Sequence, residues 1–329
     1  MNKFKKIGLT ALAASLVSVS ANAGELTASG SASITAEGWS GAIGSAGATA
    51  WSMGNSVNFA GSTELDNGLT VSMAFELDQG TANNSSNGFD SHSVTISSDS
   101  LGSVKFSGHG GSSTTGALVG TAAGALWDNF DGKTKGLGVA TIPDHIISSG
   151  GGNNSFYYTS PSVMDGLNVT ASWNPAATAG VNSMLGLGVN YTGVEGLSVS
   201  YATIDVEAHS TASEGDNEVL KASYAYGPVT VAYSNFHYNI GTSAAATNLE
   251  MTSYGITYTI SDELSLTYGT EESDKGSTSV DAEFSGFTAA YTAGGMTITG
   301  KMIEGENVNH ANTAGDDVDY WSLGASFAF

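Results

Sequence analysis

The last stretch of the chain, residues 316–329, constrains the fold more than any other. From Trp321 to Phe329 every odd-numbered position is apolar, and the even positions between them are small or polar. Side chains that alternate with a period of two are typical of a β-strand with one apolar face and one polar face. Because the sequence ends on an aromatic residue rather than in a polar tail, we expect a strand that closes a cylinder against the first strand. An edge strand of a secreted β-sandwich is the alternative.

The start of the chain has the composition of a secretory signal peptide. Lysines at positions 3, 5 and 6 precede an apolar run at 7–19, and the small residues 21–23 follow it. This order predicts that Met1–Ala23 is removed on export and that one domain, 24–329, remains. No later run approaches the roughly 20 apolar residues of a membrane-spanning helix. The chain has no cysteine, which excludes disulfides and thiol chemistry.

The composition favours a wall with one face in lipid and one face in water. Charged residues make up only 12% of the chain, glycine is abundant at 44 residues, and the mean hydropathy is close to zero. Such values are expected when alternate side chains of each strand point to lipid and to a polar interior. The formal net charge is −22 and there is no arginine. A nucleic-acid partner is therefore excluded, because phosphate binding needs a basic surface.

Alternating segments recur along the whole chain, and their connections follow a rule. Tight turns rich in Gly, Asn and Asp alternate with longer connections, which places all short turns at one rim of an up-and-down barrel. Greek-key crossings in a sandwich would not keep this order. The sixteen predicted strands lie near 26–37, 55–65, 68–77, 92–98, 102–109, 154–160, 166–174, 183–192, 196–207, 218–227, 229–238, 250–260, 263–271, 280–293, 295–305 and 317–329.

With its signal peptide, sixteen strands, alternating connections and terminal Phe329, the chain resembles the general porins of Gram-negative bacteria, of alphaproteobacterial type. The resemblance covers all of 24–329. It implies an all-β, transmembrane, antiparallel up-and-down barrel in the outer membrane, surrounded by lipopolysaccharide and outer-membrane lipid. It also implies a homotrimer in which each monomer has its own pore, and it makes Phe329 the signal that the barrel-assembly machinery recognises.

The resemblance further implies that the third long loop, 110–153, folds inward and narrows the pore. Residues 117–129 of this loop are compatible with a short helix. Asp128, Asp131 and Asp144 are the candidates for the acidic side of the constriction. The alternative interpretation is that these acids lie on a solvated loop tip.

Three lysines, Lys105, Lys221 and Lys301, lie inside predicted strands. On the lipid face a lysine at mid-depth would cost about 2–4 kcal/mol, so we expect all three to face the lumen. By resemblance they would form a basic wall opposite the loop acids. The alternative is that each lysine pairs with an interior acid such as Glu76. A wall without arginine departs from the family pattern and argues against a tight anion site, because bidentate recognition of anions is a property of arginine.

Acidic residues crowd the side of the long connections and predict a cation-preferring pore. A negative mouth concentrates cations over about 8–10 Å at physiological salt. Members of this set include Glu271, Glu272, Asp274 and Glu306. The carboxylates of Asp316, Asp317 and Asp319 could also hold Ca²⁺ through oxygen ligands, with solvated loop charge as the alternative. No other cofactor is expected.

The outer surface of the predicted barrel has two recognisable features. Aromatic residues near strand ends suit the two girdles at the membrane interfaces. These residues are Trp173, Tyr191, Tyr258, Trp321 and Phe329. The first two strands instead carry small residues, which allow another wall to approach closely and predict a trimer contact. These residues are Ala28, Gly30, Ala32, Ala36 and Gly61.

These observations predict a non-enzymatic channel for passive diffusion of ions and small hydrophilic solutes. A substrate-selective channel would need an aromatic track along the lumen, and inward aromatics such as Tyr157 are few. An outer-membrane barrel enzyme would need a Ser/His or Asp/His set at one strand end, which the sequence does not supply. A secreted adhesin or surface-layer protein would show repeats and a separate anchor, and neither is found.

Overall fold

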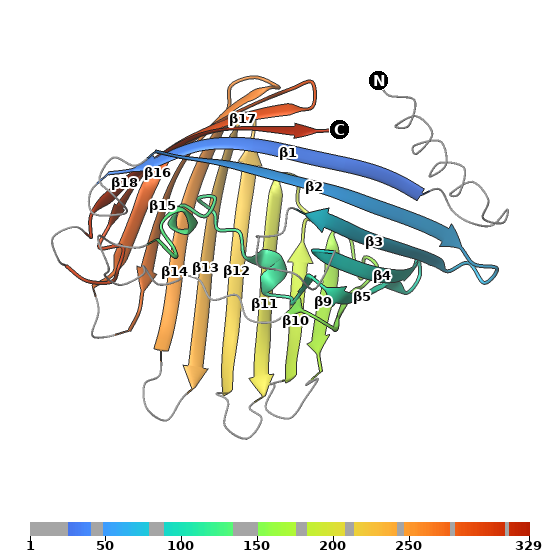
Figure 1. The fold of residues 1–329 in the computed structure, drawn as a ribbon. Helices are drawn as coiled ribbons and strands as arrows, with labels where there is room; N and C mark the ends of the chain where they lie inside the picture. Colours follow the sequence, from blue (N-terminus) through green and yellow to red (C-terminus); the bar gives the residue numbers. More distant parts are fainter. Residues whose placement is uncertain are drawn as a thin grey trace, which may run out of the picture.

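The protein folds into one closed antiparallel barrel of sixteen strands in a computed structural model (Figure 1). The structure describes residues 26–40, 49–78, 89–133, 151–175, 183–207, 214–241, 247–276, 280–312 and 316–329. Each barrel strand pairs with its neighbours in the chain, and the last strand pairs with the first. The barrel strands are β1 (Leu26–Trp39), β2 (Thr49–Glu64), β3 (Thr70–Asp78), β4 (Ser91–Ser98), β5 (Gly102–His109), β8 (Ser155–Thr159), β9 (Leu167–Asn174), β10 (Ser183–Tyr191), β11 (Leu197–Glu207), β12 (Glu214–Tyr226), β13 (Val229–Gly241), β14 (Thr247–Thr259), β15 (Leu264–Asp274), β16 (Ala282–Ala293), β17 (Met296–Glu306) and β18 (Val318–Ala328).

The predicted barrel is confirmed, and each predicted segment overlaps one observed strand. The main differences lie toward the long connections, where several strands extend further than the sequence indicated. β2, for example, begins at Thr49 rather than near residue 55, because Thr49 pairs with Gly38 across the β1–β2 ladder.

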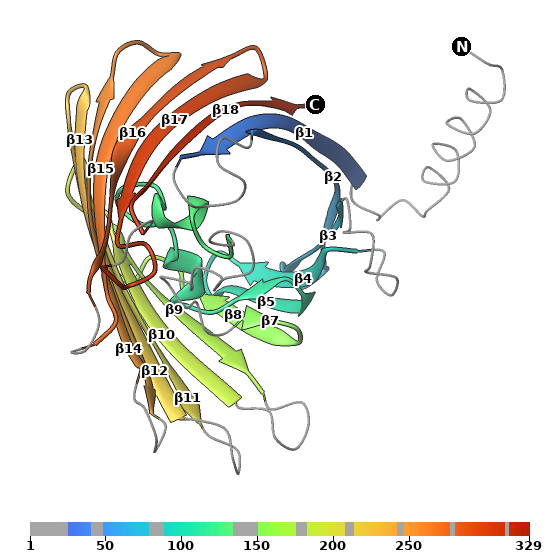
Figure 2. The same ribbon diagram turned by 60° about the vertical axis from the view of Figure 1, so that its left-hand side comes forward.

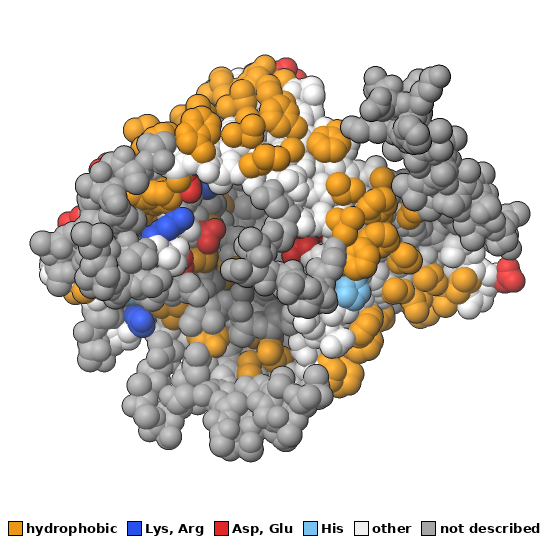
Figure 3. Space-filling model, in the orientation of Figure 1, with side chains coloured by type: hydrophobic (Ala, Val, Ile, Leu, Met, Phe, Trp, Pro, Cys, Tyr) orange, Lys and Arg blue, Asp and Glu red, His pale blue; other side chains and the backbone are white. Residues whose placement is uncertain are grey.

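Alternation sets the two sides of the wall. In β18, Tyr320 and Ser322 are buried inside the barrel, whereas Trp321 and Leu323 are 43% and 57% exposed on its outside. The large apolar side chains are thus on the outer surface, the reverse of a water-soluble domain. Figure 3 shows hydrophobic side chains gathered at the top of the molecule, where β17 and β18 run in Figure 1.

The end of the chain closes the cylinder. β18 lies antiparallel to β1, and Phe329 and Gly30 exchange two backbone hydrogen bonds of 2.7 and 3.0 Å. The Phe329 ring lies over Gly30, where a Cβ atom would overlap it. A larger residue at position 30 would have to displace this ring.

The tight turns have the backbone conformations that their residues favour. Gly294 and Gly295 join β16 to β17, and both have positive φ angles, 59° and 79°. Two-residue hairpins with positive φ at both positions match the natural twist of the flanking strands.

The helix expected at 117–129 is wrong. This segment contains only one-turn 3₁₀ helices, η1 (Gly116–Leu118) and η2 (Trp127–Asn129), and Gly124 and Ala125 between them have positive φ angles of 89° and 55°. The backbone N–H groups of Ala122 and Ala123 bond to the barrel wall instead of to a helical turn. A two-residue ladder, β6 (Gly111–Ser112) with β7 (Gly151–Gly152), lies at the base of the same loop. Across the described ranges, no helix is long and apolar enough to cross a membrane.

Adjacent positions of β14 provide a test of the two faces. Ile256 is 47% exposed on the outer surface, whereas Thr257 faces inward and hydrogen bonds to Thr267. We expect Ile256→Lys to lower the free energy of unfolding in a lipid bilayer by about 2–4 kcal/mol, because it places a charge in hydrocarbon. Thr257→Lys should cost clearly less. Equilibrium urea titrations in vesicles measure both values, and equal losses would contradict this assignment of the faces.

Candidate functional site

The long connection after β5 enters the barrel. Figure 2 shows its green segment, with η1 and η2, lying inside the ring of strands. Its described part, 110–133, contacts inward-facing side chains of the wall from β9 to β18. The interior of the barrel is therefore narrowed by the protein itself.

Small wall residues form a seat on which this inner loop lies. The N–H groups of Ala122 and Ala123 donate hydrogen bonds of 2.9 Å to Ser234 Oγ on β13 and Ser253 Oγ on β14. Thr114 N–H donates to Ser172 Oγ on β9 at 3.0 Å. A Cβ atom at any of three wall glycines would overlap loop atoms; these glycines are Gly186, Gly255 and Gly269. The loop can approach the wall closely only because these positions are Ser or Gly.

Glu271 was expected among the acids at the mouth of the pore. The structure instead places it beneath the inner loop. Its side chain is only 2% exposed and faces inward from β15. One carboxylate oxygen accepts a hydrogen bond from Thr121 Oγ1, and the other accepts one from Trp127 N–H at 2.8 Å. No local pattern indicates this role, because Glu271 and Glu272 are adjacent residues of the same type.

An apolar cluster fills the interior between the end of the described loop and the wall from β12 to β18. Phe130 is fully buried, with its ring centroid 5.2 Å from Phe284 and 6.2 Å from Tyr320. Val308, from the connection after β17, is also fully buried in the cluster. Trp39 Nε1 donates to Asn129 O at 3.0 Å. This half of the interior is therefore a packed core.

The opposite half, β1 to β5, presents mainly hydroxyl and amide groups to the interior. Ser31 Oγ and Ser56 Oγ lie 2.9 Å apart on neighbouring strands. The inward positions, taken from the alternation with exposed apolar residues, include Ser29, Ser31, Ser33, Thr35, Ser56, Asn58, Ser62, Ser72, Thr95, Ser97 and Ser103. Such a wall suits an aqueous passage, because each group can hydrogen bond to water.

The predicted constriction acids are placed as follows. Asp128 is exposed on η2, directly after the residue that Glu271 holds. Asp131 is half-buried one turn later and has a partner of its own. Asp144 lies outside the described residues.

The three strand lysines lie at inward positions but on different parts of the wall. Lys105 on β5 is exposed, between the outward residues Val104 and Phe106. Lys221 on β12 donates from Nζ to Gly120 O of the loop, and Lys301 on β17 shares the inward face with buried Ile303. Lys221 therefore lies on the wall that carries the loop, not opposite it, and the structure does not bring the three ammonium groups together.

Glu76, the interior acid proposed as a lysine partner, faces inward from β3. Its Oε2 accepts a hydrogen bond of 3.4 Å from Ser91 Oγ on the neighbouring strand. Lys221 is held by a backbone carbonyl rather than by an acid. Tyr157 on β8 also takes an inward position, as its parity indicated.

The three carboxylates proposed for Ca²⁺ have separate surroundings and partners. Asp316 is fully buried, Asp317 Oδ1 accepts from Asn307 N–H at 3.2 Å, and Asp319 Oδ2 accepts from Ser40 Oγ at 2.9 Å. In the part of the chain that the structure describes, no group of three or more His, Asp or Glu side chains converges on a possible metal position.

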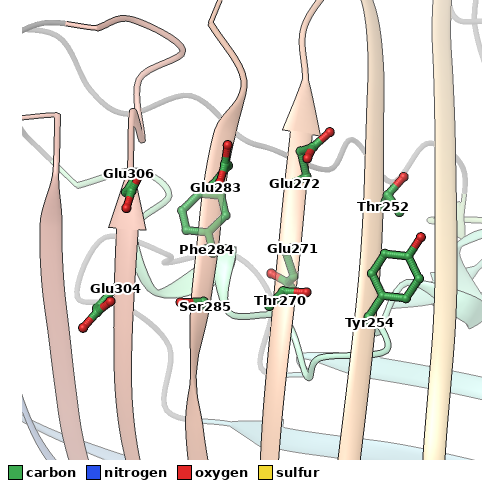
Figure 4. Close-up of a pocket in the computed structure, with 10 residues that line it drawn as sticks. All are labelled: Thr252, Tyr254, Thr270, Glu271, Glu272, Glu283, Phe284, Ser285, Glu304 and Glu306. Carbon is green, nitrogen blue, oxygen red and sulfur yellow. The ribbon is translucent and has the colours of Figure 1, made fainter.

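Several acids expected at the mouth lie on the outer surface instead. Glu272 alternates with the inward residues Glu271 and Ser273, so its side chain points away from the interior. Figure 4 shows Glu272, Glu283 and Glu306 beside one another on β15, β16 and β17. With Glu304 and Tyr254 they line an outer hollow of about 400 Å³. These carboxylates are near the rim but do not line the passage.

The seat of the loop can be tested by adding volume to it. We expect Gly255→Val to push the loop off the wall, because the new side chain would overlap Ala122 O. Overpacking of this kind costs about 1–3 kcal/mol of folding free energy, and it should also change the single-channel conductance. Gly300→Val is the matched control, since the nearest atom to its Cβ, Ser322 O, is 4.0 Å away. An unchanged conductance in a folded Gly255→Val barrel would contradict the seat.

Comparisons with known proteins agree on the family and the fold. The family model described as Gram-negative porin matches residues 8–329. Among solved structures, the anion-selective porin from Comamonas acidovorans superposes with a TM-score of 0.70 at 16% identity, covering 93% of this chain and 99% of that chain.

The trimer form of OmpT, an outer membrane protein of Vibrio cholerae, gives a TM-score of 0.68 at 12% identity, over 94% of this chain and 100% of that chain. A mutant of the Rh. blastica porin gives a TM-score of 0.63 at 14% identity, over 93% of this chain and 100% of that chain. A comparison with curated protein sequences gave no match. Because the family model covers nearly all of the sequence and the barrel has the porin fold, the chain belongs to the family of Gram-negative porins.

Proposed function

We propose that this outer-membrane porin is a general diffusion channel for ions and small hydrophilic solutes, and that it prefers cations. The observation that supports this most is the divided interior, with a packed core on one side and an exposed hydroxyl-lined wall on the other. A wall of this kind offers hydrogen bonds to any small polar solute and no built site for one of them. The protein is a channel and not an enzyme.

Charge supports the preference for cations. The chain has 31 acidic residues against 9 basic ones. Of the strand lysines, Lys221 is engaged by the loop, which leaves Lys105 as the exposed ammonium on the hydroxyl-lined wall. Asp128 on the loop would face the passage, with Asp131 and Asp144 adding to the acidic side. The anion-selective porin that this chain resembles is 16% identical, so the likeness shows the shared fold alone.

Reversal potentials under a KCl gradient test the selectivity. We expect the wild-type potential to have the sign of cation preference, Asp128→Asn to move it toward zero, and Lys105→Glu to move it away from zero. Charges within a Debye length of about 8–10 Å of the path have the largest effect. Glu272→Gln, on the outer surface, is the control that should change the potential least. An anion-preferring wild type would contradict the proposal.

We further propose a homotrimer whose subunits meet through the outer face of β1 to β5. The strands β3, β4, β5 and β8 have only 9, 8, 8 and 5 residues. A tilted transmembrane strand needs about 9–11 residues, so β4, β5 and β8 are too short to face lipid over the whole membrane. β12, β13 and β14, by contrast, have 13 residues each. The small outward residues of β1 and β2 adjoin the short side.

Bulky substitutions can test which part of the outer surface lies in the contact between subunits and which part faces lipid. Ala32 on β1 would lie in the contact between subunits, whereas Ala289 on β16 would face lipid. We expect Ala32→Trp to weaken the trimer by about 1–3 kcal/mol, because added volume is costly in a packed contact, and Ala289→Trp to leave it intact. Native mass spectrometry and unheated gel electrophoresis measure the oligomer. Equal trimer stability in the two variants would contradict the assignment.

Assembly and export complete the proposal. Residues 1–23 would be removed as a signal peptide, and Phe329, exposed to 76% at the seam, would present the signal that the barrel-assembly machinery reads. Lipopolysaccharide and outer-membrane lipid would cover the remaining outer surface. The signal peptide lies outside the described residues.

A further inference from the structure

We propose that Glu271 is the positioning residue of the inner loop, and that its buried carboxylate fixes the width of the passage by holding both ends of the turn 121–127. The inference deepens the proposed function and rests on it. It concerns a titratable side chain that lies inside the wall and does not itself line the water path.

The geometry is that of a clamp. Glu271 Oε1 accepts a hydrogen bond from Thr121 Oγ1, and Oε2 accepts one from Trp127 N–H at 2.8 Å. Thr121 Oγ1 in turn accepts a hydrogen bond of 2.7 Å from Ala125 N–H inside the turn. One side chain of the barrel wall therefore holds two points of the loop directly and a third, Ala125, through Thr121.

The turn needs such a clamp because of its backbone. Gly124 and Ala125 have positive φ angles of 89° and 55°. A residue with a Cβ atom, such as Ala125, disfavours this left-handed backbone conformation and keeps it only where surrounding contacts hold the backbone in place. The hydrogen bond from Ala125 N–H to Thr121 Oγ1 holds this conformation, and Glu271 in turn holds Thr121.

The clamp also determines where the loop presents its charge. Asp128 directly follows Trp127, whose N–H group Glu271 holds, and its side chain is exposed. The neighbouring contacts to Ser234 and Ser253 are neutral hydrogen bonds. Hydrogen bonds to a carboxylate are roughly twice as strong as neutral ones. Loss of Glu271 should therefore move Asp128 even though the serine contacts remain.

The experiment compares four variants of the full-length protein in planar bilayers: Glu271→Leu, Glu271→Gln, Thr121→Val and Glu272→Leu. We expect Glu271→Leu and Thr121→Val to lose the single uniform conductance step and to show a broad distribution with raised open-channel noise. Glu271→Gln keeps one acceptor oxygen for Trp127 N–H and should recover most of the uniform step. Glu272→Leu changes the adjacent outward residue and should behave as wild type.

A second measurement reads the loop without using conduction. Because the chain has no cysteine, Asp128→Cys gives a single attachment point for a spin label. We expect the label to be more mobile in the Glu271→Leu and Thr121→Val backgrounds than in the Asp128→Cys protein alone. A wild-type protein that carries no current would refute the channel function, while the label would still report on the clamp.

Several outcomes would overturn the clamp. One is a folded Glu271→Leu barrel with the wild-type conductance step and an unchanged label spectrum. If Glu271→Leu does not assemble, Thr121→Val tests the clamp in its place. This variant keeps the wall carboxylate and removes only the loop hydroxyl. An assembled Thr121→Val barrel with a uniform step and an immobile label refutes the proposal.

Discussion

The structure depends on one constraint, which is that no backbone polar group can be left without a partner in lipid. A sheet meets this constraint only if its two edges pair with each other. Here the pairing of β1 with β18 ends in the two hydrogen bonds between Gly30 and Phe329. The side-chain pattern follows from closure, because a wall with lipid on one side and water on the other needs alternate apolar and polar residues along every strand. The low charge content and the glycine-rich turns are consequences of the same requirement.

Closure creates an interior too wide to be filled by the side chains of the wall alone. The chain fills half of it with the inner loop and with Val308 from the connection after β17, packed around Phe130. Where the loop backbone bonds to the wall at Ala122 and Ala123, the wall residues beneath it are Ser and Gly, so the two can approach closely. The other half keeps its hydroxyl groups exposed. The width of the passage is thus a matter of how firmly one loop is attached.

The strands could be predicted from the sequence because a period of two is a local signal, and the tight turns because their glycines have local conformational roles. The inner loop could be expected only from its length and from the family resemblance. Its conformation could not, because Ala122 and Ala123 bond to serines more than 100 positions away in the sequence, and these bonds replaced the expected helix. Alternation predicted the inward position of Lys221, but it carries no information on what covers that side chain. The acidity of the long connections did not separate Glu271 from Glu272.

What covers a charged side chain matters most for ion selectivity, because the net charge of the chain does not say which charges line the passage. Glu271 is buried beneath the loop and accepts hydrogen bonds from it, Lys221 donates to a loop carbonyl, and Glu272, Glu283 and Glu306 face away from the passage. Among the described charges, Asp128 on the loop and Lys105 on β5 are exposed, and Glu76 faces inward from β3. Because the position of Asp128 depends on the loop and the loop depends on Glu271, a side chain that never meets a permeating ion would still determine the field that the ion crosses.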